Sequence, residues 1–368
     1  MPTDKPRVLH VIARYNVGGT ARYLNNLLPQ LTYEVETLLA VGHVQGHEIE
    51  DSSLENIEFI RIEHLGRQIN PIQDLRAYLE LRRTVKKFKP HIIHSHTFKA
   101  GLLCRLMYLR IPKVHTFHGH LMSDPEFSKR ALQVIINIER RLAKLTKKLI
   151  TVGEQVSKDL LQVGVGKAGK YISIASEGQK LVFLSRRDAR DNLDLDQETP
   201  VVLWMARMAP VKNPSLALEV ARLMPEINFL MAGGGELFTQ IKDQAPSNTL
   251  LLSWVDAAYV IPAADVFLST SLNEGIPYTL LEVQSFGIPI VAVNSGAISE
   301  LVQHEVNGHL CDADAVSLAQ SIKGLFDNPE KRRMISNAAR DCAVARERLS
   351  EMAPAHLRVY TVLIESTK

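Results

Sequence analysis

Short apolar runs alternate with longer amphipathic stretches through the first half of the chain. The apolar runs have strand length and many β-branched residues, and they are RVLHVI (7–12), EVETLLAV (34–41), HIIHSH (91–96), KVHTFH (113–118) and KLITVG (148–153). Helical periodicity is expected in residues 21–31, 71–88, 98–109 and 127–146. Because a crossover helix lets successive strands run parallel, this alternation predicts a parallel sheet.

The same alternation restarts after the charged segment SRRDARDNLDLDQETP (185–200), which is predicted to be a linker or a surface loop. The strands expected beyond it are 201–206, 227–232, 249–254, 264–270 and 288–293, and the helices are 214–224, 278–286, 315–326, 329–345 and 352–363. The sequence therefore predicts an α/β protein with two doubly wound, Rossmann-like domains. Ligands of such sheets bind at the carboxyl ends of the strands, so we expect a site in the cleft between the two domains.

The composition is typical of a soluble protein of this size. The chain has 368 residues, of which 46% are hydrophobic and 23% charged, and no apolar run approaches the roughly 18 residues of a membrane span. The beginning of the sequence lacks the apolar core of a secretion signal. The three scattered cysteines, Cys104, Cys311 and Cys342, favour a reducing compartment without disulfides. We therefore expect a cytoplasmic protein.

The charge is distributed unevenly along the chain. Residues 1–178 carry 26 Lys and Arg against 17 Asp and Glu, although the net charge of the whole chain is only +3. The basic stretches RRTVKKFK (82–89) and RRLAKLTKKL (140–149) fall on expected amphipathic helices. Each is typical of an ordinary solvated face, or of docking on an anionic lipid surface. We predict peripheral association with the inner face of the plasma membrane through the basic N-terminal domain, and no binding of nucleic acid, since no recognition motif is present.

Glycines and cations follow several of the expected strands. Gly18 and Gly19 come after the first strand, and AGGGEL (232–237) comes after a strand of the second half. Glycines there let a backbone approach a ligand closely, although they are also typical of tight turns. Arg207 and Lys212 follow the first strand of the second half. Cations at that position can bind a diphosphate, or they form a solvated pair.

Two carboxylates frame the segment EGIPYTLLE. Glu274 is expected in the loop after a strand, and Glu282 about one turn inside the helix that follows Pro277. Phosphate would repel both carboxylates, whereas sugar and ribose hydroxyls can donate hydrogen bonds to them. The amide groups at the beginning of the helix can meanwhile bind phosphate. These residues predict a nucleotide-sugar site, and the alternative for each glutamate is a helix-dipole or capping role.

These motifs together resemble family 4 of the glycosyltransferases, which have the GT-B fold. The resemblance rests on the glycine pair in GGTAR, on RMAPVK, on EGIPYTLLE and on ELVQHEVNGHL, and it extends over nearly the whole chain. It implies domains at 1–180, on the acceptor side, and 181–348, which binds the nucleotide sugar. It also implies that the helix in 349–368 packs back on the first domain.

The resemblance also implies roles for single residues. Arg207 and Lys212 would bind the diphosphate, Glu274 the hydroxyls of the donor sugar, and Glu282 the ribose. His118, in HTFHGH, would line the donor and acceptor site. Further donor contacts are expected from Gly18, Gly19, Gly234, Gly275, Ile276 and Pro277. Two positions depart from the family pattern, because Ala21 stands where the family has a glutamate, and IASEGQKL replaces an Asn-Gly before the linker.

The activity expected from the resemblance is that of a retaining glycosyltransferase in polysaccharide or cell-envelope biosynthesis. It would move a hexose or N-acetylhexosamine from a UDP-sugar to a lipid-linked, envelope or exopolysaccharide acceptor. A GDP-mannose-dependent mannosyltransferase and a nucleotide-sugar epimerase of GT-B fold are the alternatives. A dinucleotide-dependent oxidoreductase is disfavoured because NVGGTA does not match Gly-x-Gly-x-x-Gly. A sugar-binding protein without activity is the remaining class.

Six of the thirteen histidines fall within residues 91–120: His91, His94, His96, His115, His118 and His120. Zinc sites usually combine histidines with carboxylates or cysteines, which are scarce in this segment. The histidines are therefore interpreted as strand-end side chains that face a polar cleft. We expect no metal site and no cofactor beyond the nucleotide-sugar co-substrate.

Overall fold

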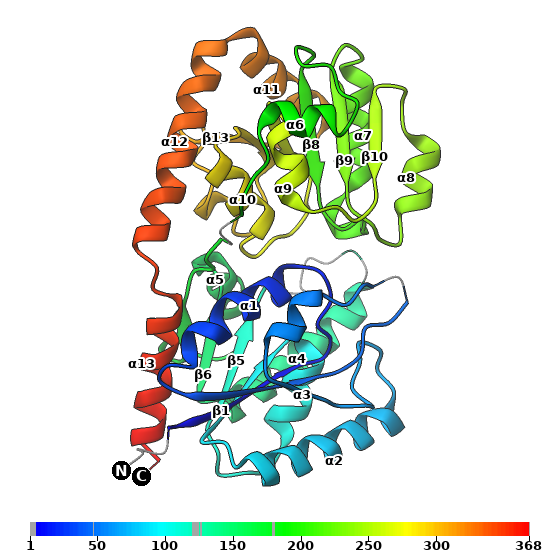
Figure 1. Cartoon of the computed structure of the whole chain (residues 1–368). Coiled ribbons are helices and arrows are strands. Elements are labelled where there is room, and N and C mark those ends of the chain that lie inside the picture. The colour runs from blue at the N-terminus through cyan, green and yellow to red at the C-terminus, as the bar shows by residue number, and fades with distance from the viewer. Residues whose placement is uncertain (1–4, 47, 120–124, 126, 179–180, 368) are drawn as a thin grey trace. The chain divides into compact units, whose positions relative to one another are not determined.

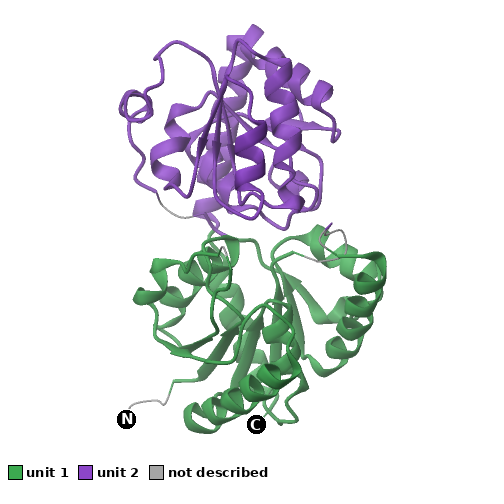
Figure 2. Cartoon of the chain, turned by 90° about the vertical axis from the view of Figure 1, so that its right-hand side faces the viewer, with its two compact units in different colours: residues 1–122, 127–176, 350–368 green, residues 123–126, 177–349 purple. Residues whose placement is uncertain are grey.

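The computed structural model describes residues 5–46, 48–119, 125, 127–178 and 181–367, and it consists of two compact units (Figures 1 and 2). Unit 1 contains the described parts of 1–122, 127–176 and 350–368, and unit 2 contains the described parts of 123–126 and 177–349. Each unit is built on one sheet in which all paired strands are parallel. The predicted α/β class with two parallel-sheet domains is confirmed.

Unit 1 has a seven-stranded sheet in the order β3-β2-β1-β4-β5-β6-β7. Its strands are β1 (Arg7–Ile12), β2 (Glu36–Val41), β3 (Phe59–Arg61), β4 (Ile92–His96), β5 (Lys113–Phe117), β6 (Lys148–Thr151) and β7 (Tyr171–Ser173). Its helices are α1 (Gly19–Leu31), α2 (Pro71–Phe88), α3 (Phe98–Leu106), α4 (Lys129–Leu145), α5 (Glu154–Gln162) and α13 (Met352–Glu365), with short 3-10 turns at Ser52–Asn56 and Ala168–Lys170. Strands β2 and β3 are added on one side of β1, and β4 to β7 are added on the other side. The switch point of this unit therefore lies between β1 and β4.

Helix α2 shows how the sequence sets an element of this unit. The Asn70 side chain accepts hydrogen bonds from the amides of Ile72 and Gln73, and Pro71 fixes the first helical position. The inward face buries Ala77, Leu81, Thr84 and Val85. The helix ends at Lys89, whose φ of 52° is left-handed.

Unit 2 has a six-stranded sheet in the order β10-β9-β8-β11-β12-β13. Its strands are β8 (Val201–Met205), β9 (Asn228–Ala232), β10 (Thr249–Leu252), β11 (Val266–Ser269), β12 (Ile290–Val293) and β13 (Gly308–Cys311). Its helices are α6 (Arg186–Asp191), α7 (Pro214–Leu223), α8 (Phe238–Gln244), α9 (Ala257–Val260), α10 (Tyr278–Phe286), α11 (Ala315–Asp327) and α12 (Pro329–Arg348), with 3-10 turns at Pro210–Lys212, Ile261–Ala263 and Ile298–Glu300. The switch point lies between β8 and β11.

The charged segment 185–200 was predicted to be a linker or a surface loop, and this holds only for residues 192–200, which form turns and bends. It contains α6, which the Ser185 side chain caps, and the Arg190 side chain is fully buried. Arg190 bonds Asp265 before β11 at 2.9 Å and the backbone oxygens of Asp196, Gln197, Thr199 and Ala263. The prediction was wrong for residues 186–191 because a single arginine with enough acceptors can anchor a segment that has few apolar side chains.

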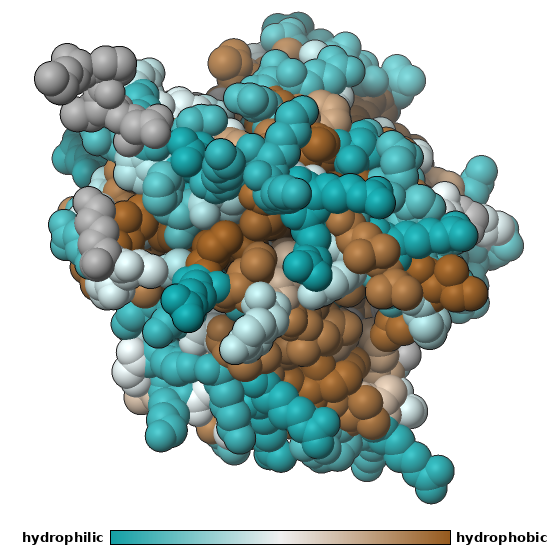
Figure 3. All heavy atoms as spheres, turned by 90° about the horizontal axis from the view of Figure 1, so that it is seen from below, coloured by the Kyte–Doolittle hydropathy of each residue, from teal (hydrophilic) through white to brown (hydrophobic). Residues whose placement is uncertain are grey.

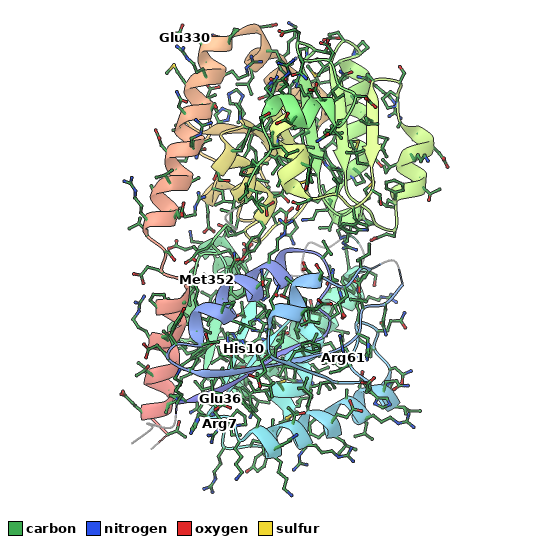
Figure 4. All side chains as sticks on the ribbon, viewed as in Figure 1. Arg7, His10, Glu36, Arg61, Glu330 and Met352 are labelled. Atoms are coloured by element: carbon green, nitrogen blue, oxygen red, sulfur yellow. The ribbon has the colours of Figure 1, made fainter. Side chains whose placement is uncertain are left out.

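Helix α13 belongs to unit 1 although it is the last helix of the chain, and it packs against α1 and β4. Figure 4 labels Met352, at its beginning, and His10 on β1. The helix buries Met352, Val359, Tyr360 and Leu363 together with His356. Within the described residues, no helix combines the length and the apolar character that a membrane span requires.

Candidate active site

The loops after β8 and β11 meet at the switch point of unit 2. The buried Thr270 hydroxyl joins them, because it accepts from the Trp204 indole at 2.8 Å and lies 2.9 Å from the backbone oxygens of Lys212 and Asn213. The amide of Leu272 donates to the Val211 oxygen at 2.8 Å. The loop that carries Lys212 is therefore fixed to the loop that carries Glu274.

Lys212 and Glu274 form an ion pair at this switch point. The Lys212 Nζ lies 2.5 Å from Glu274 Oε1, and the two side chains are 23% and 10% exposed. A carboxylate and an ammonium group held together and open to solvent can bind a hydroxyl and an anionic oxygen of one ligand. The structure thus brings together two of the residues that were predicted for the site.

Arg207 lies two residues beyond β8 and is held by a different carboxylate. Its guanidinium contacts both Glu236 oxygens at 3.1 and 3.2 Å, and both side chains are partly exposed. No ion pair with Arg207 was predicted from the sequence. A diphosphate would compete with Glu236 for this arginine, so the predicted role of Arg207 stays a prediction.

The glycines after β9 fit against neighbouring parts of unit 2. A Cβ at Gly233 would lie 2.0 Å from the Ala206 oxygen, and one at Gly235 would lie 2.6 Å from the Met208 oxygen. A Cβ at Gly234 would lie 2.3 Å from the Trp254 indole nitrogen. These glycines let the β9 loop run beside the β8 loop, with a hydrogen bond of 2.8 Å from the Met208 amide to the Gly234 oxygen. Packing within the unit thus accounts for them, and a donor contact by Gly234 stays a prediction.

Gly296, in the loop after β12, is a residue of the site that the sequence did not indicate. Its φ is +55°, and a Cβ there would lie 2.1 Å from the Glu274 backbone oxygen. The adjacent Ala297 amide donates to the same oxygen at 3.0 Å. The position of Glu274 therefore depends on a neighbouring loop that approaches closely enough to exclude a side chain. The sequence shows a glycine at this position but not its contact, because Glu274 lies 22 residues away along the chain.

We expect Gly296→Ala to displace the Glu274 backbone, to lower turnover at least ~10-fold and to lower the free energy of unfolding by about 1–3 kcal/mol. Steady-state kinetics and urea unfolding measure the two effects. Gly324→Ala in α11 is the matched control, because a Cβ there meets nothing within 4 Å. That control should raise stability by up to about 1 kcal/mol. Equal behaviour of the two variants would contradict the role given to Gly296.

Helix α10 begins directly after Pro277, as predicted. Among the described residues its first turn has no side-chain cap and no acidic residue, so its first amides can bind an anion. Gly275 lies in the loop before the helix, and Ile276 is buried at 9% exposure. Glu282 lies farther inside α10 and is fully buried. Burial sets Glu282 apart from Glu274, and its predicted ribose contact stays a prediction.

Gly18 and Gly19 lie at the beginning of α1 in unit 1. Gly18 is the residue before the helix, and the nearest described atom to a Cβ there would be 3.9 Å away. Packing within the described chain does not require a glycine at this position, but its backbone φ of +156° does, because residues other than glycine rarely adopt it. Helix α1 has no acidic residue in its first turn, so its amide groups are suited to bind an anion. Ala21 is buried, at 1% exposure, and the predicted donor contacts here stay predictions.

His118 lies one residue beyond β5 and ends a chain of histidines. His118 Nε2 lies 3.0 Å from His96 Nδ1, and His96 Nε2 lies 3.1 Å from His10 Nδ1. The Tyr23 and His118 rings pack in a T-shaped arrangement, with ring centroids 4.6 Å apart. Burial lowers the pKa of His118 to about 3, with a smaller effect of His356. His118 is therefore neutral near pH 7 and can offer one donor and one acceptor.

The histidines of 91–120 were predicted to be strand-end side chains that face a cleft, and only some lie at strand ends: His96 is the last residue of β4 and His118 follows β5. His94 and His115 lie inside strands, and with His96 they are buried. His91 is exposed and accepts from the Arg7 amide at 2.9 Å, while His120 is outside the described residues. The prediction failed for His94 and His115 because a strand with both faces covered can bury polar side chains that hydrogen-bond to one another.

Helix α13 supplies partners to this network that the sequence did not indicate. His94 bonds the Tyr360 hydroxyl at 2.7 Å and the Thr116 hydroxyl at 2.7 Å. His356 Nδ1 donates to the Met352 oxygen at 2.7 Å, so its Nε2 accepts from the Tyr23 hydroxyl at 2.9 Å. Burial lowers the pKa of His356 to about 4 and raises that of Tyr360 well above its ordinary value.

Three of these histidines have ring nitrogens that lie close enough to one another to bind one metal ion. The nitrogens of His10, His94 and His96 lie within 4.8 Å of one another. Both nitrogens of His94 and of His96 already have hydrogen-bond partners, while His10 Nε2 has none among the described residues. The hydrogen bonds account for this geometry without a metal, and the expected absence of a metal stays a prediction.

Comparison with known proteins agrees with this architecture. Residues 185–341 match the family model described as "Glycosyl transferases group 1", and residues 17–170 match "Glycosyltransferase Family 4". An Escherichia coli UDP-Gal:alpha-D-GlcNAc-diphosphoundecaprenol alpha-1,3-galactosyltransferase is 27% identical over 338 residues, which cover 85% of this chain and 86% of that protein.

Solved structures share the fold over nearly the whole chain. Anabaena HepE in complex with UDP and glucose is similar with a TM-score of 0.80 at 20% identity, covering 97% of this chain and all of HepE. WaaG, a glycosyltransferase involved in lipopolysaccharide biosynthesis, is similar with a TM-score of 0.76 at 12% identity, covering 96% of this chain and 99% of WaaG. Two parallel-sheet units with this topology match the GT-B fold of these structures, and the two family models identify the chain as a glycosyltransferase. The chain belongs to glycosyltransferase family 4, as the motifs predicted.

Proposed function

We propose that this enzyme transfers a hexose or N-acetylhexosamine from a UDP-sugar, with retention of configuration, to a lipid-linked or cell-envelope glycan. The observation that carries the proposal is the Lys212–Glu274 pair at the β8/β11 switch point. The UDP donor and the diphosphoundecaprenol acceptor are supported by the name of the E. coli relative, and HepE was solved with UDP and glucose. Transfer of sugar to a lipid-linked acceptor of this kind would place the protein at the inner face of the plasma membrane.

The chemistry proposed for unit 2 is positioning and charge stabilisation. Lys212 would exchange its contact with Glu274 for an oxygen of the diphosphate, and the first amides of α10 would bind the same group. Glu274 would then accept a hydrogen bond from a hydroxyl of the donor sugar. As the bond to the sugar breaks, negative charge grows on the departing diphosphate, which these groups stabilise. No step of this scheme needs a metal ion or another cofactor.

A thermal-shift panel of UDP-, GDP- and other nucleotide sugars tests the donor. We expect UDP-sugars to raise the melting temperature, since a ligand at one hundred times its Kd stabilises by about 2.7 kcal/mol. Stabilisation by GDP-mannose alone would support a mannosyltransferase instead.

Product analysis tests the reaction. The anomeric configuration of the product, read by NMR, distinguishes retention from inversion. Isomerised donor formed without an acceptor would support the epimerase. Transfer that continues in EDTA agrees with the proposed independence from metal, and its loss would contradict that part.

A further inference from the structure

Helix α2 carries an exposed apolar face that the proposed transfer reaction does not use. Ile72, Leu75 and Leu79 lie on one side of the helix, at i, i+3 and i+7, and they are 67%, 60% and 44% exposed. Burial of Ala77, Leu81 and Val85 on the opposite side shows that these three are not part of the core. Leu106, the last residue of α3, and Tyr108, in the segment after it, are also exposed.

Cations continue the same face toward the end of α2. Arg82, Arg83, Lys86 and Lys89 line a cavity of about 580 Å³, together with apolar side chains of Leu79, Val85, Pro90, Leu109 and Ile111. Figure 3 views the molecule from the side on which α2 lies in Figure 1, and it shows apolar side chains gathered among hydrophilic ones. An apolar surface with a cationic border is thus open to solvent.

The two acidic side chains of α2 do not neutralise this border. Asp74 is bound to the buried Lys99 at 2.5 Å, and Glu80 is bound to His64. Both carboxylates are therefore engaged with other parts of unit 1. The surface therefore keeps its positive charge. A partner that complements it has anionic groups on its surface and apolar groups beneath them.

We propose that the outward face of α2, with residues 106–111, docks the protein on an anionic lipid bilayer. The four cations bind headgroup phosphates, and Ile72, Leu75, Leu79 and Tyr108 insert at the boundary of the acyl chains. This combination of one cationic and one apolar region on a helix is that of helices which lie in the membrane interface. Of the two basic stretches noted in the sequence, the proposal selects 82–89 and not 140–149.

Flotation of the full-length protein with vesicles tests this proposal. We expect binding to phosphatidylcholine vesicles that contain about one third phosphatidylglycerol, and little binding to pure phosphatidylcholine. Arg82→Gln, Arg83→Gln, Lys86→Gln and Lys89→Gln combined should weaken binding at least ~100-fold, because each near-surface cation contributes roughly a fivefold effect. Ile72→Ser with Leu75→Ser should weaken it as well, and high salt should then remove what remains.

A second quadruple variant of equal charge is the matched control. Arg141→Gln, Lys144→Gln, Lys147→Gln and Lys158→Gln change exposed cations of unit 1 outside α2, and binding should fall by less than about threefold. Equal losses in both quadruple variants would overturn the proposal in favour of a diffuse charge effect. Self-association that Ile72→Ser and Leu75→Ser abolish, or preference for an oligonucleotide over vesicles, would also overturn it. Because flotation uses no donor or acceptor, failure here leaves the proposed transfer untouched.

Discussion

Lys212→Ala is expected to lower turnover by about 10²–10³-fold, which is the effect of removing one preorganised charge from a departing group. The substitution removes the ammonium group at the switch point and leaves the Glu274 carboxylate without this partner. The backbone of residue 212 stays held by the Thr270 hydroxyl, so the loop should keep its position. Initial rates with a UDP-sugar and the melting temperature of the variant measure the two quantities.

Two further variants sharpen this test. Lys242→Ala removes an exposed lysine of α8 in the same unit and should leave turnover unchanged. Glu274→Gln keeps the size of the side chain but weakens its acceptor, so it should lower turnover less than Lys212→Ala does. Full activity of Lys212→Ala in a folded protein would contradict the assignment of this lysine to the diphosphate.

Unit 1 is expected to unfold in mild acid, at a higher pH than a typical domain does. Burial lowers the pKa of His10 to about 3 and that of His356 to about 4, and it lowers those of His94 and His96 well below their ordinary value. The unfolded chain therefore binds protons below pH 6.5 that the folded chain cannot bind. Each such histidine lowers the free energy of unfolding by about 1.4 kcal/mol for every pH unit between 6.5 and its folded pKa.

Urea unfolding between pH 7 and pH 5 measures this slope. Four buried histidines make the expected loss several kcal/mol per pH unit, which is comparable with the whole stability of many domains. His10→Leu should make the slope shallower by about 1.4 kcal/mol per pH unit. Val11→Ala, at the buried neighbouring position, should lower stability equally at every pH. A slope that is the same in wild type and in His10→Leu would refute this account.

Most of the fold could be predicted from the sequence because its strands and helices are long enough to show a period. Helix α10 was expected at 278–286 and occupies those residues, since Pro277 and the left-handed Gly287 mark its two ends. The strands β3, β7 and β13 were not predicted. Each has three or four residues at an edge of its sheet, too few to show alternation, and its pairing depends on the neighbouring strand.

The site was predictable only where its residues directly follow strands. Lys212 and Glu274 fall after β8 and β11, so the order of strands brings them together. Gly296 was missed because its constraint comes from the backbone of another loop. The Tyr360 contact with His94 joins residues 266 apart in sequence, and no local pattern indicates it.

The position of α13 in unit 1 has a consequence for the synthesis of the protein. A ribosome completes residues 1–176 and must then make residues 177–349 before this helix can emerge. At about 5–20 residues per second, that interval lasts roughly ten to thirty seconds. During it, nascent unit 1 exposes the apolar and histidine-rich surface that Met352, His356 and Tyr360 later cover. Unit 1, although it is synthesised first, therefore completes its folding last. A stop codon just before α13 would leave unit 1 incomplete and exposed to chaperones and proteases.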